Sequence, residues 1–131
     1  MSIRGFGTTC PCGGVPPYAA CCGRLHRQES RAETAEELMR SRYAAYAVGE
    51  TDHVFRTWHP RTRPPEVTPH AELTWTGLEI LDTVAGGPDD EEGVVEFRAH
   101  FTGPDGPGVL HERSRFLRRA GRWVYLDGDL S

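Results

Sequence analysis

Apolar residues between positions 34 and 48 recur with the period of an α-helix. The positions that share this face are Leu38, Met39, Arg42, Tyr43, Tyr46 and Ala47. Residues three and four apart lie on one side of a helix, so the pattern predicts a helix with one apolar face. Thr34 and Glu37 form a capping box at its beginning, and Gly49 is typical of its end.

A second, shorter helix is predicted directly after the first. It begins at Thr51 or Asp52 and carries Val54, Phe55 and Trp58. The following HPRTRPP ends it, because proline lacks the amide that a continuing helix needs.

The period changes to that of β-strands after about residue 70. Four segments rich in β-branched and aromatic residues follow, AELTWTGLEILDTV, VVEFRAHF, VLHERSRFLRR and WVYLDGD, separated by GGPDDEEG, GPDGPG and AGR. The second segment places Val95, Phe97, Ala99 and Phe101 on one face. Two helices followed by this meander predict an α+β fold, with helices packed on one face of a four-stranded antiparallel sheet.

The third strand breaks the usual alternation. The parity that turns Leu110 and Phe116 inward also turns Glu112 and Ser114 inward. A buried carboxylate is costly unless it is paired or hydrogen-bonded. Glu112 is therefore either held for structural reasons, with Arg42, Tyr43 and Tyr125 as candidate partners, or it lines a polar pocket suited to acid–base work.

A pocket between helices and sheet would bring further side chains together. The candidates are Tyr43, Trp58, His59, Glu112 and Ser114. His59 has a second interpretation, since a histidine beside proline at a helix end commonly caps the last carbonyls. We assign no catalytic residue and lean against an enzyme. His100 and His111 are expected on the outward face of the sheet, among arginines. This stripe either faces an RNA or an acidic partner, or is a solvated face whose charges pair with Glu96 and other acids.

All four cysteines of the chain lie in CPCGGVPPYAACCG, residues 10–23. Disulfides need an oxidising compartment, and redox sites usually show CxxC where this chain has CxC. Four thiolates satisfy the tetrahedral preference of Zn²⁺, so we favour a zinc site on Cys10, Cys12, Cys21 and Cys22, with His26 as an alternative ligand. Such a closed site is normally structural, since it leaves no position for water.

The residues between the cysteines suit a short metal-bound loop. Gly13 and Gly14 allow a tight turn, Pro16 and Pro17 stiffen the return, and YAACC predicts a helical turn that presents the last two thiols. Metal binding would supply folding energy that about twenty residues with almost no core lack.

Charge and composition limit the partners. The 131 residues carry a net charge of −4. Residues 1–63 hold nine arginines and six acids, and residues 64–131 hold six arginines and thirteen acids. The acidic body argues against broad phosphate-backbone binding. No apolar run is long enough for a membrane span, and MSIRGFGTT lacks the apolar centre of a secretory signal, so we expect a cytoplasmic protein.

The cysteine spacing, CxC, eight residues, then CC, resembles the SEC-C motif, the zinc knuckle at the tail of the SecA translocation ATPase and of many small bacterial proteins. The last ligand there is often His; Cys22 takes that place here. GRLHRQ, TAEELMRSRYAAYAVGETDHVFRTWHPRTRP and LHERSRFLRRAGRWVYLDGD resemble the YchJ-like proteins. Those proteins join a SEC-C knuckle to a cone-shaped domain of the nuclear transport factor 2-like fold.

This resemblance implies two parts, a zinc knuckle and linker over residues 1–30 and a cone domain over residues 31–131. It also implies docking of the knuckle to a macromolecule. Arg24, His26 and Arg27 give the knuckle a positive edge. A protein partner is expected first, with a ribosomal surface or nucleic acid as alternatives. Cones of this kind frequently form homodimers through their sheets.

Overall fold

The computed structural model describes residues 9–14, 16–67 and 72–131, in one antiparallel sheet and several short helices. The element order is η1 (Tyr18–Ala20), α1 (Cys22–His26), α2 (Ala35–Val48), α3 (Thr51–Arg56), β1 (Thr74–Ala85), β2 (Glu92–Gly103), β3 (Gly106–Arg119) and β4 (Arg122–Leu130). Three parts of the sequence predictions lie outside the described residues. They are residues 1–8 of the N-terminal stretch, residue 15 of the cysteine loop, and residue 71 at the beginning of the first predicted strand.

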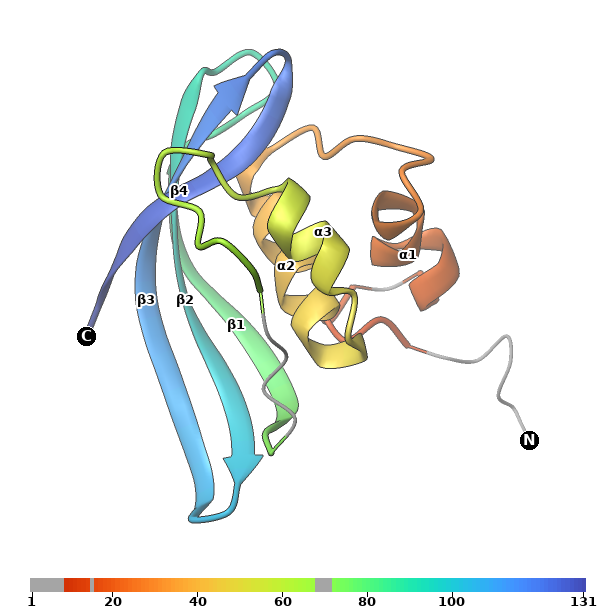
Figure 1. The fold of residues 1–131 in the computed structure, drawn as a ribbon, viewed down its shortest axis with the longest axis vertical. Helices are drawn as coiled ribbons and strands as arrows, with labels where there is room; N and C mark the ends of the chain where they lie inside the picture. Colours follow the sequence, from red (N-terminus) through yellow and green to blue (C-terminus); the bar gives the residue numbers. More distant parts are fainter. Residues whose placement is uncertain (1–8, 15, 68–71) are drawn as a thin grey trace.

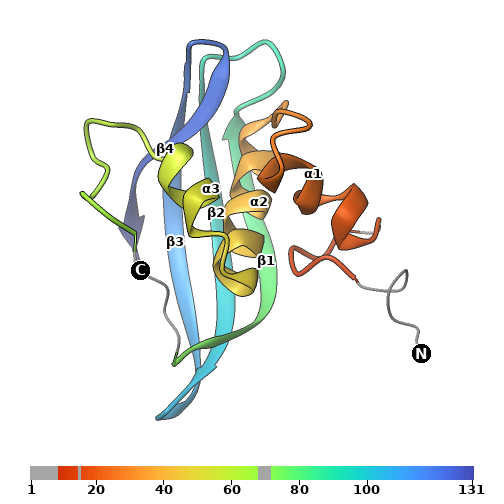
Figure 2. The same ribbon diagram turned by 45° about the vertical axis from the view of Figure 1, so that its right-hand side comes forward.

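The molecule has three layers (Figures 1 and 2). The sheet has the order β1-β2-β3-β4, with each neighbouring pair antiparallel. Helices α2 and α3 cover one face of it. The cysteine-bearing head, which we define as residues 9–14 and 16–30, packs on the side of α2 away from the sheet. The predicted α+β meander is confirmed.

Helix α2 begins and ends where its sequence predicts. The Thr34 side chain accepts a hydrogen bond from the Glu37 amide at 3.0 Å, and Gly49 closes the helix in a left-handed conformation with φ 86°. A left-handed residue is tolerated best as glycine. The Glu37 carboxylate does not complete the reciprocal box at Thr34; it accepts from the Glu33 amide at 2.8 Å.

The core lies between α2 and the inner face of the sheet. The inward parity predicted for β2 is confirmed for Val95, Phe97 and Ala99, which are buried, whereas Phe101 is half-buried. Leu38 and Met39 meet this face from α2. Apolar burial of this kind stabilises the domain by roughly 25 cal/mol per Å².

The outer face of the sheet carries cross-strand ion pairs. His100 lies 2.6 Å from Glu79, and His111 lies 2.6 Å from Glu96. Arg113 also contacts Glu96, at 2.8 Å. The outward histidine and arginine stripe therefore pairs with acids on neighbouring strands, as the second of its two interpretations predicts. Among the helices of the described residues, none has the length and apolarity needed to cross a membrane.

Candidate metal centre and cone cavity

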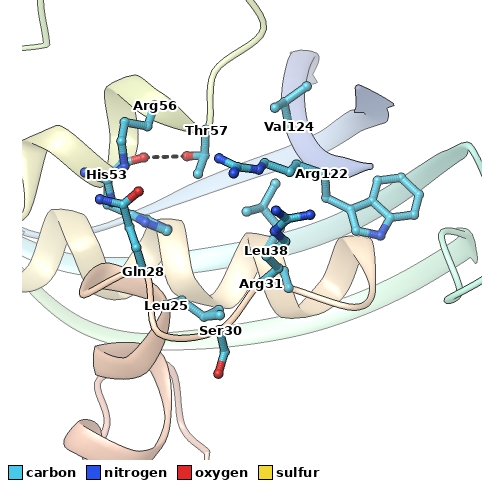
Figure 3. A pocket seen from close by; sticks show the side chains of 12 residues that line it. Leu25, Gln28, Ser30, Arg31, Leu38, His53, Arg56, Thr57, Arg122 and Val124 are labelled. Atoms are coloured by element: carbon cyan, nitrogen blue, oxygen red, sulfur yellow. Dashed lines mark hydrogen bonds between the residues drawn. The ribbon is translucent and has the colours of Figure 1, made fainter. Parts of the chain in front are cut away.

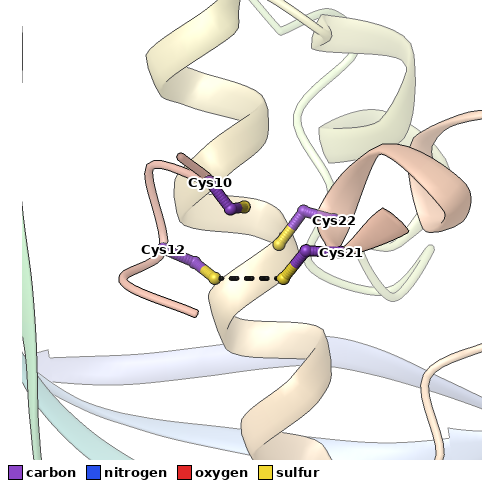
Figure 4. A group of neighbouring side chains, drawn as sticks. All are labelled: Cys10, Cys12, Cys21 and Cys22. Atoms are coloured by element: carbon purple, nitrogen blue, oxygen red, sulfur yellow. Dashed lines mark hydrogen bonds between the residues drawn. The ribbon is translucent and has the colours of Figure 1, made fainter. Parts of the chain in front are cut away.

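The four cysteine sulfurs converge beside α2 (Figure 4). All four Sγ atoms lie within 4.8 Å of one another, and Cys12 and Cys21 are 3.7 Å apart. A tetrahedral ion with Zn–S bonds of about 2.3 Å separates its sulfurs by about 3.8 Å. All four are free thiols, and three of them are buried. The cluster thus has the donor set and the spacing of a closed tetrahedral metal site.

Two glycines shape the loop that carries the first pair of thiols. Gly13 has φ 88° and donates its amide to the Cys10 carbonyl at 3.1 Å, which closes the predicted tight turn. A Cβ on Gly14 would lie 2.9 Å from the Cys21 sulfur and 3.3 Å from the Cys12 sulfur. A side chain at Gly14 would therefore occupy the space into which the sulfurs point.

The thiols influence one another's ionisation strongly. A hydrogen bond from the Cys22 thiol is the largest of the influences that lower the pKa of Cys12 to about 5, and the Gly14 amide adds to them. Burial raises the pKa of Cys21 to about 11, and the shared hydrogen bond with Cys12 raises the pKa of Cys22. The geometry therefore favours one thiolate over several, and a bound cation is what would let all four ionise.

His26, the alternative ligand, points away from the sulfurs. Its Nε2 lies 2.8 Å from the Ser41 carbonyl, and its Nδ1 lies 2.6 Å from the Tyr18 hydroxyl. A carbonyl only accepts, so Nε2 carries the proton and Nδ1 accepts from Tyr18 when the ring is neutral. Burial lowers the His26 pKa and favours that neutral form. Both ring nitrogens thus have partners outside the sulfur cluster.

The head is fixed directly to α2. Arg40 donates to the Cys12 carbonyl at 2.6 Å, and Arg24 forms an ion pair with Glu37. Ala44 on α2 is fully buried against the cysteines. The apolar residues of the head therefore pack against α2, which belongs to the cone domain.

A chain of buried polar groups continues from the head into the domain. Ser41 donates its hydroxyl to the Leu38 carbonyl at 2.7 Å, so it accepts from His53 Nε2, which lies 2.9 Å away. The rings of His26 and His53 are stacked at a tilt, with centroids 4.6 Å apart. His53 Nδ1 is buried and has no hydrogen-bond partner among the described residues.

The cone contains a cavity of about 200 Å³ between α2 and the sheet. Four of the five predicted pocket residues line it, namely Tyr43, Trp58, Glu112 and Ser114. His59 does not: its Nδ1 accepts the Arg61 amide at 3.0 Å, and it caps no carbonyl of α3 in the way its alternative interpretation expects. Glu112 and Ser114 line the cavity because alternate residues of β3 face the helices. His59 lies in the turn after α3 and is not part of the cavity wall.

Glu112 is held by hydroxyl groups. Its Oε2 accepts from Ser114 at 2.7 Å and from Tyr125 at 2.8 Å, so of the two candidate tyrosines, Tyr43 and Tyr125, the one that bonds to it is Tyr125. Arg42, also predicted, lines the same cavity but bonds elsewhere, to the Val54 carbonyl at 2.9 Å and to the Thr57 hydroxyl. Burial and the nearby Glu112 charge raise the Tyr125 pKa, so its hydroxyl stays a donor.

Three features of the cavity were not predicted from the sequence. The Arg42 guanidinium lies over the rings of both Trp58 and Tyr125, at 5.1 and 4.7 Å from their centroids, and these two rings are themselves in T-shaped contact. The Trp58 Nε1 atom is buried and unpartnered among the described residues. Trp75 also lines the cavity. An aromatic residue in a predicted strand indicates burial. Its contact with Tyr43 of α2 could not be predicted, because it depends on how the helix packs on the sheet.

An α+β cone with a four-cysteine head defines a two-part protein of the nuclear transport factor 2-like class. A model of the YchJ middle NTF2-like domain matches residues 34–128. The chain is 52% identical to a UPF0225 protein of Streptomyces coelicolor, over 92% of this chain and 94% of that one. It is 50% identical to a UPF0225 protein of Deinococcus radiodurans, over 90% and 86% of the two chains. The chain belongs to the YchJ-like family.

Solved structures agree with this assignment. A SEC-C motif containing protein of Rhodopseudomonas palustris superposes with a TM-score of 0.80 and 34% identity, over 93% of this chain and 98% of that one. A SEC-C motif containing protein of Psychrobacter arcticus gives a TM-score of 0.76 and 28% identity, over 99% and 86%. The likeness covers the head as well as the cone.

Proposed function

We propose that the head binds one structural Zn²⁺ through Cys10, Cys12, Cys21 and Cys22. The convergence of all four sulfurs supports this, with a Cys12–Cys21 separation of 3.7 Å. Four thiolates fill the tetrahedral coordination and leave no position for a reacting water. The ion therefore holds the head on α2. Cysteines without disulfides support a location in a reducing compartment such as the cytoplasm, which is part of this proposal.

Elemental analysis of purified protein tests the site. One zinc per chain is expected in the wild type, and the double variant C10S/C12S should lose it. His26→Gln serves as the matched control and should keep one zinc, because its ring nitrogens bond to Tyr18 and Ser41. Stoichiometric zinc in C10S/C12S, or its loss from the His26 variant at saturating zinc, would refute a four-cysteine site.

We propose further that the zinc-held head docks to a protein partner. The positive edge expected from Arg24 and Arg27 is neutralised by ion pairs with Glu37 and Glu29. A head without net positive charge on this edge favours a protein surface over a phosphate backbone. The SEC-C likeness of the solved relatives supports a module of this kind.

Tagged protein and nuclease treatment separate the two partner classes. Captured partners should be lost with C10S/C12S, kept with His26→Gln and unaffected by nuclease. Identical partners with the cysteine variant would contradict docking through the head. Partners that disappear after nuclease would point to nucleic acid instead.

A second candidate function is small-molecule binding in the cone cavity. The observation that favours it is that Trp58, whose Nε1 donor has no partner among the described residues, lines the same cavity as Glu112. A flat molecule with one acceptor and one donor would satisfy both and stack on the aromatic walls. Benzamide has these groups. It should shift the Trp58 indole resonance, and Glu112→Ala should weaken that effect while His59→Gln leaves it unchanged.

A further inference from the structure

A cleft of about 220 Å³ opens at the seam between the head and the cone domain. Three segments far apart in the sequence meet there: the linker after α1, the end of α3 and the beginning of β4 (Figure 3). Each segment contributes one arginine, and these are Arg31, Arg56 and Arg122. We call this feature the arginine cleft.

The charged residues that line the arginine cleft are all positive. No acidic residue lines it, and within the described part of the chain none of its three arginines forms an ion pair. By contrast, Arg24, Arg27, Arg40, Arg98, Arg113, Arg115 and Arg118 all have acidic partners. In a chain of net charge −4, three arginines without ion pairs around one concavity concentrate positive charge locally.

The arrangement of the side chains adds to the charge. In Figure 3 the Arg31 and Arg122 side chains reach into the same part of the cleft, over Leu38. The Arg56 guanidinium donates a long hydrogen bond to the His26 carbonyl, at 3.3 Å. Guanidinium groups present donors in a planar fork that matches a phosphate group.

The cleft also has an apolar floor. His53 lines it and is 4% exposed, and its Nδ1, an acceptor because Nε2 carries the proton toward Ser41, is buried without a partner among the described residues. Leu25, Leu38 and Trp123 are buried residues that line the same space. An oxyanion at the rim and an apolar group on the floor would together fill it.

We propose that the arginine cleft binds a small molecule that carries a phosphate group on an apolar body, with Arg31, Arg56 and Arg122 as the phosphate donors. A dianionic phosphate balances most of the three positive charges, and its organic part covers Leu38 and Trp123. The site is separate from the cysteine cluster and from the cone cavity. Because one wall belongs to the head, occupancy would brace the head against α3 and β4.

Titration of the full zinc-loaded protein with phenyl phosphate, followed by NMR at constant ionic strength, tests the proposal. Resonances of the Trp123 indole and of the arginine Nε groups should shift with saturation. Inorganic phosphate should shift the same arginines at higher concentration, because it lacks the apolar part. Arg56→Gln and Arg122→Gln should each weaken phenyl phosphate binding about tenfold, since each removes a charge-assisted hydrogen bond.

Arg61→Gln is the matched control. Arg61 is exposed, forms no ion pair among the described residues and lies outside the cleft lining, so this variant should bind as the wild type does. If all three variants weakened phenyl phosphate binding equally, the cause would be the loss of net positive charge and not of a specific site, and the proposal would be overturned. Chemical shifts that do not saturate would also overturn it. Zinc content measured on each sample separates failure of this site from failure of the metal centre.

Discussion

At the scale of single residues, His53 links stability to pH. Burial, followed by the charges of His26, Arg56 and Arg42, lowers its pKa from 6.5 to about 3. The folded protein therefore resists a proton that the unfolded chain accepts below pH 6.5. This stability is present above that pH and is lost as pH falls toward 3, at about 1.4 kcal/mol per unit.

We expect acidification from pH 6.5 to 5 to lower the free energy of unfolding by about 2 kcal/mol through His53 alone. Urea unfolding across this range measures it, with zinc content checked at each pH. His53→Gln keeps a donor for Ser41 and should flatten the slope. An unaltered slope in the His53 variant would contradict the assignment.

Single residues also show where sequence reasoning succeeds. The inward parity of Glu112 and Ser114 follows from a period of two, and both line the cavity. His59 was expected beside them, but a turn residue has no periodicity to fix its direction. Of the three candidate partners of Glu112, Tyr125 is the one that donates a hydrogen bond to it, whereas the Arg42 guanidinium bonds to the end of α3. Such contacts depend on how helices pack, which local pattern does not encode.

At the scale of elements, the beginning of α2 depends on one side chain. The Thr34 hydroxyl accepts the Glu37 amide at 3.0 Å, one of the amides that lack partners within the helix. Thr34→Ala should therefore lower the free energy of unfolding by about 1 kcal/mol, measured by urea denaturation. Thr34→Ser keeps an acceptor and should remain within a few tenths of the wild type. Equal stability of the two variants would show that the cap contributes nothing.

Helices and strands followed closely from local signals. Caps at Thr34 and Gly49 mark α2, and the glycine- and proline-rich turns separate the four strands. The packing of the head on α2 had no such signal, since Arg40 and Cys12 are distant in sequence and meet only in the fold. The arginine cleft was missed for the same reason. Its three arginines come from three segments, and each alone is typical of a solvated surface.

At the scale of the whole molecule, α2 is the shared layer. One side of it packs on the sheet and the other carries the head. The outer face of the sheet is covered by ion pairs such as Arg115 with Asp127 at 2.6 Å. A homodimer through that face would have to bury those charges, which carries a desolvation cost. We therefore expect partners to bind at the head, or where the head meets the cone, rather than on the outer face of the sheet.

The layered arrangement predicts how the protein responds to loss of metal. A head of about twenty residues with little core cannot hold its conformation unaided, whereas the core between α2 and the sheet does not involve the cysteines. Chelation of zinc should therefore lower hydrogen-exchange protection in α1 by about a hundredfold or more, with smaller losses on α2 near Ala44. Amides of β2 and β3 should stay protected.

Hydrogen exchange of the zinc-loaded, chelated and zinc-restored protein measures this response, and restored zinc should recover the first pattern. C10S/C12S should resemble the chelated protein without any chelator. If β2 and β3 lost protection together with α1, head and cone would form one cooperative unit, and zinc would be required for the whole fold. If α1 kept its protection, the contacts of Arg40 and His26 with neighbouring backbone carbonyls would suffice to order the head, and the structural role proposed for the ion would fail.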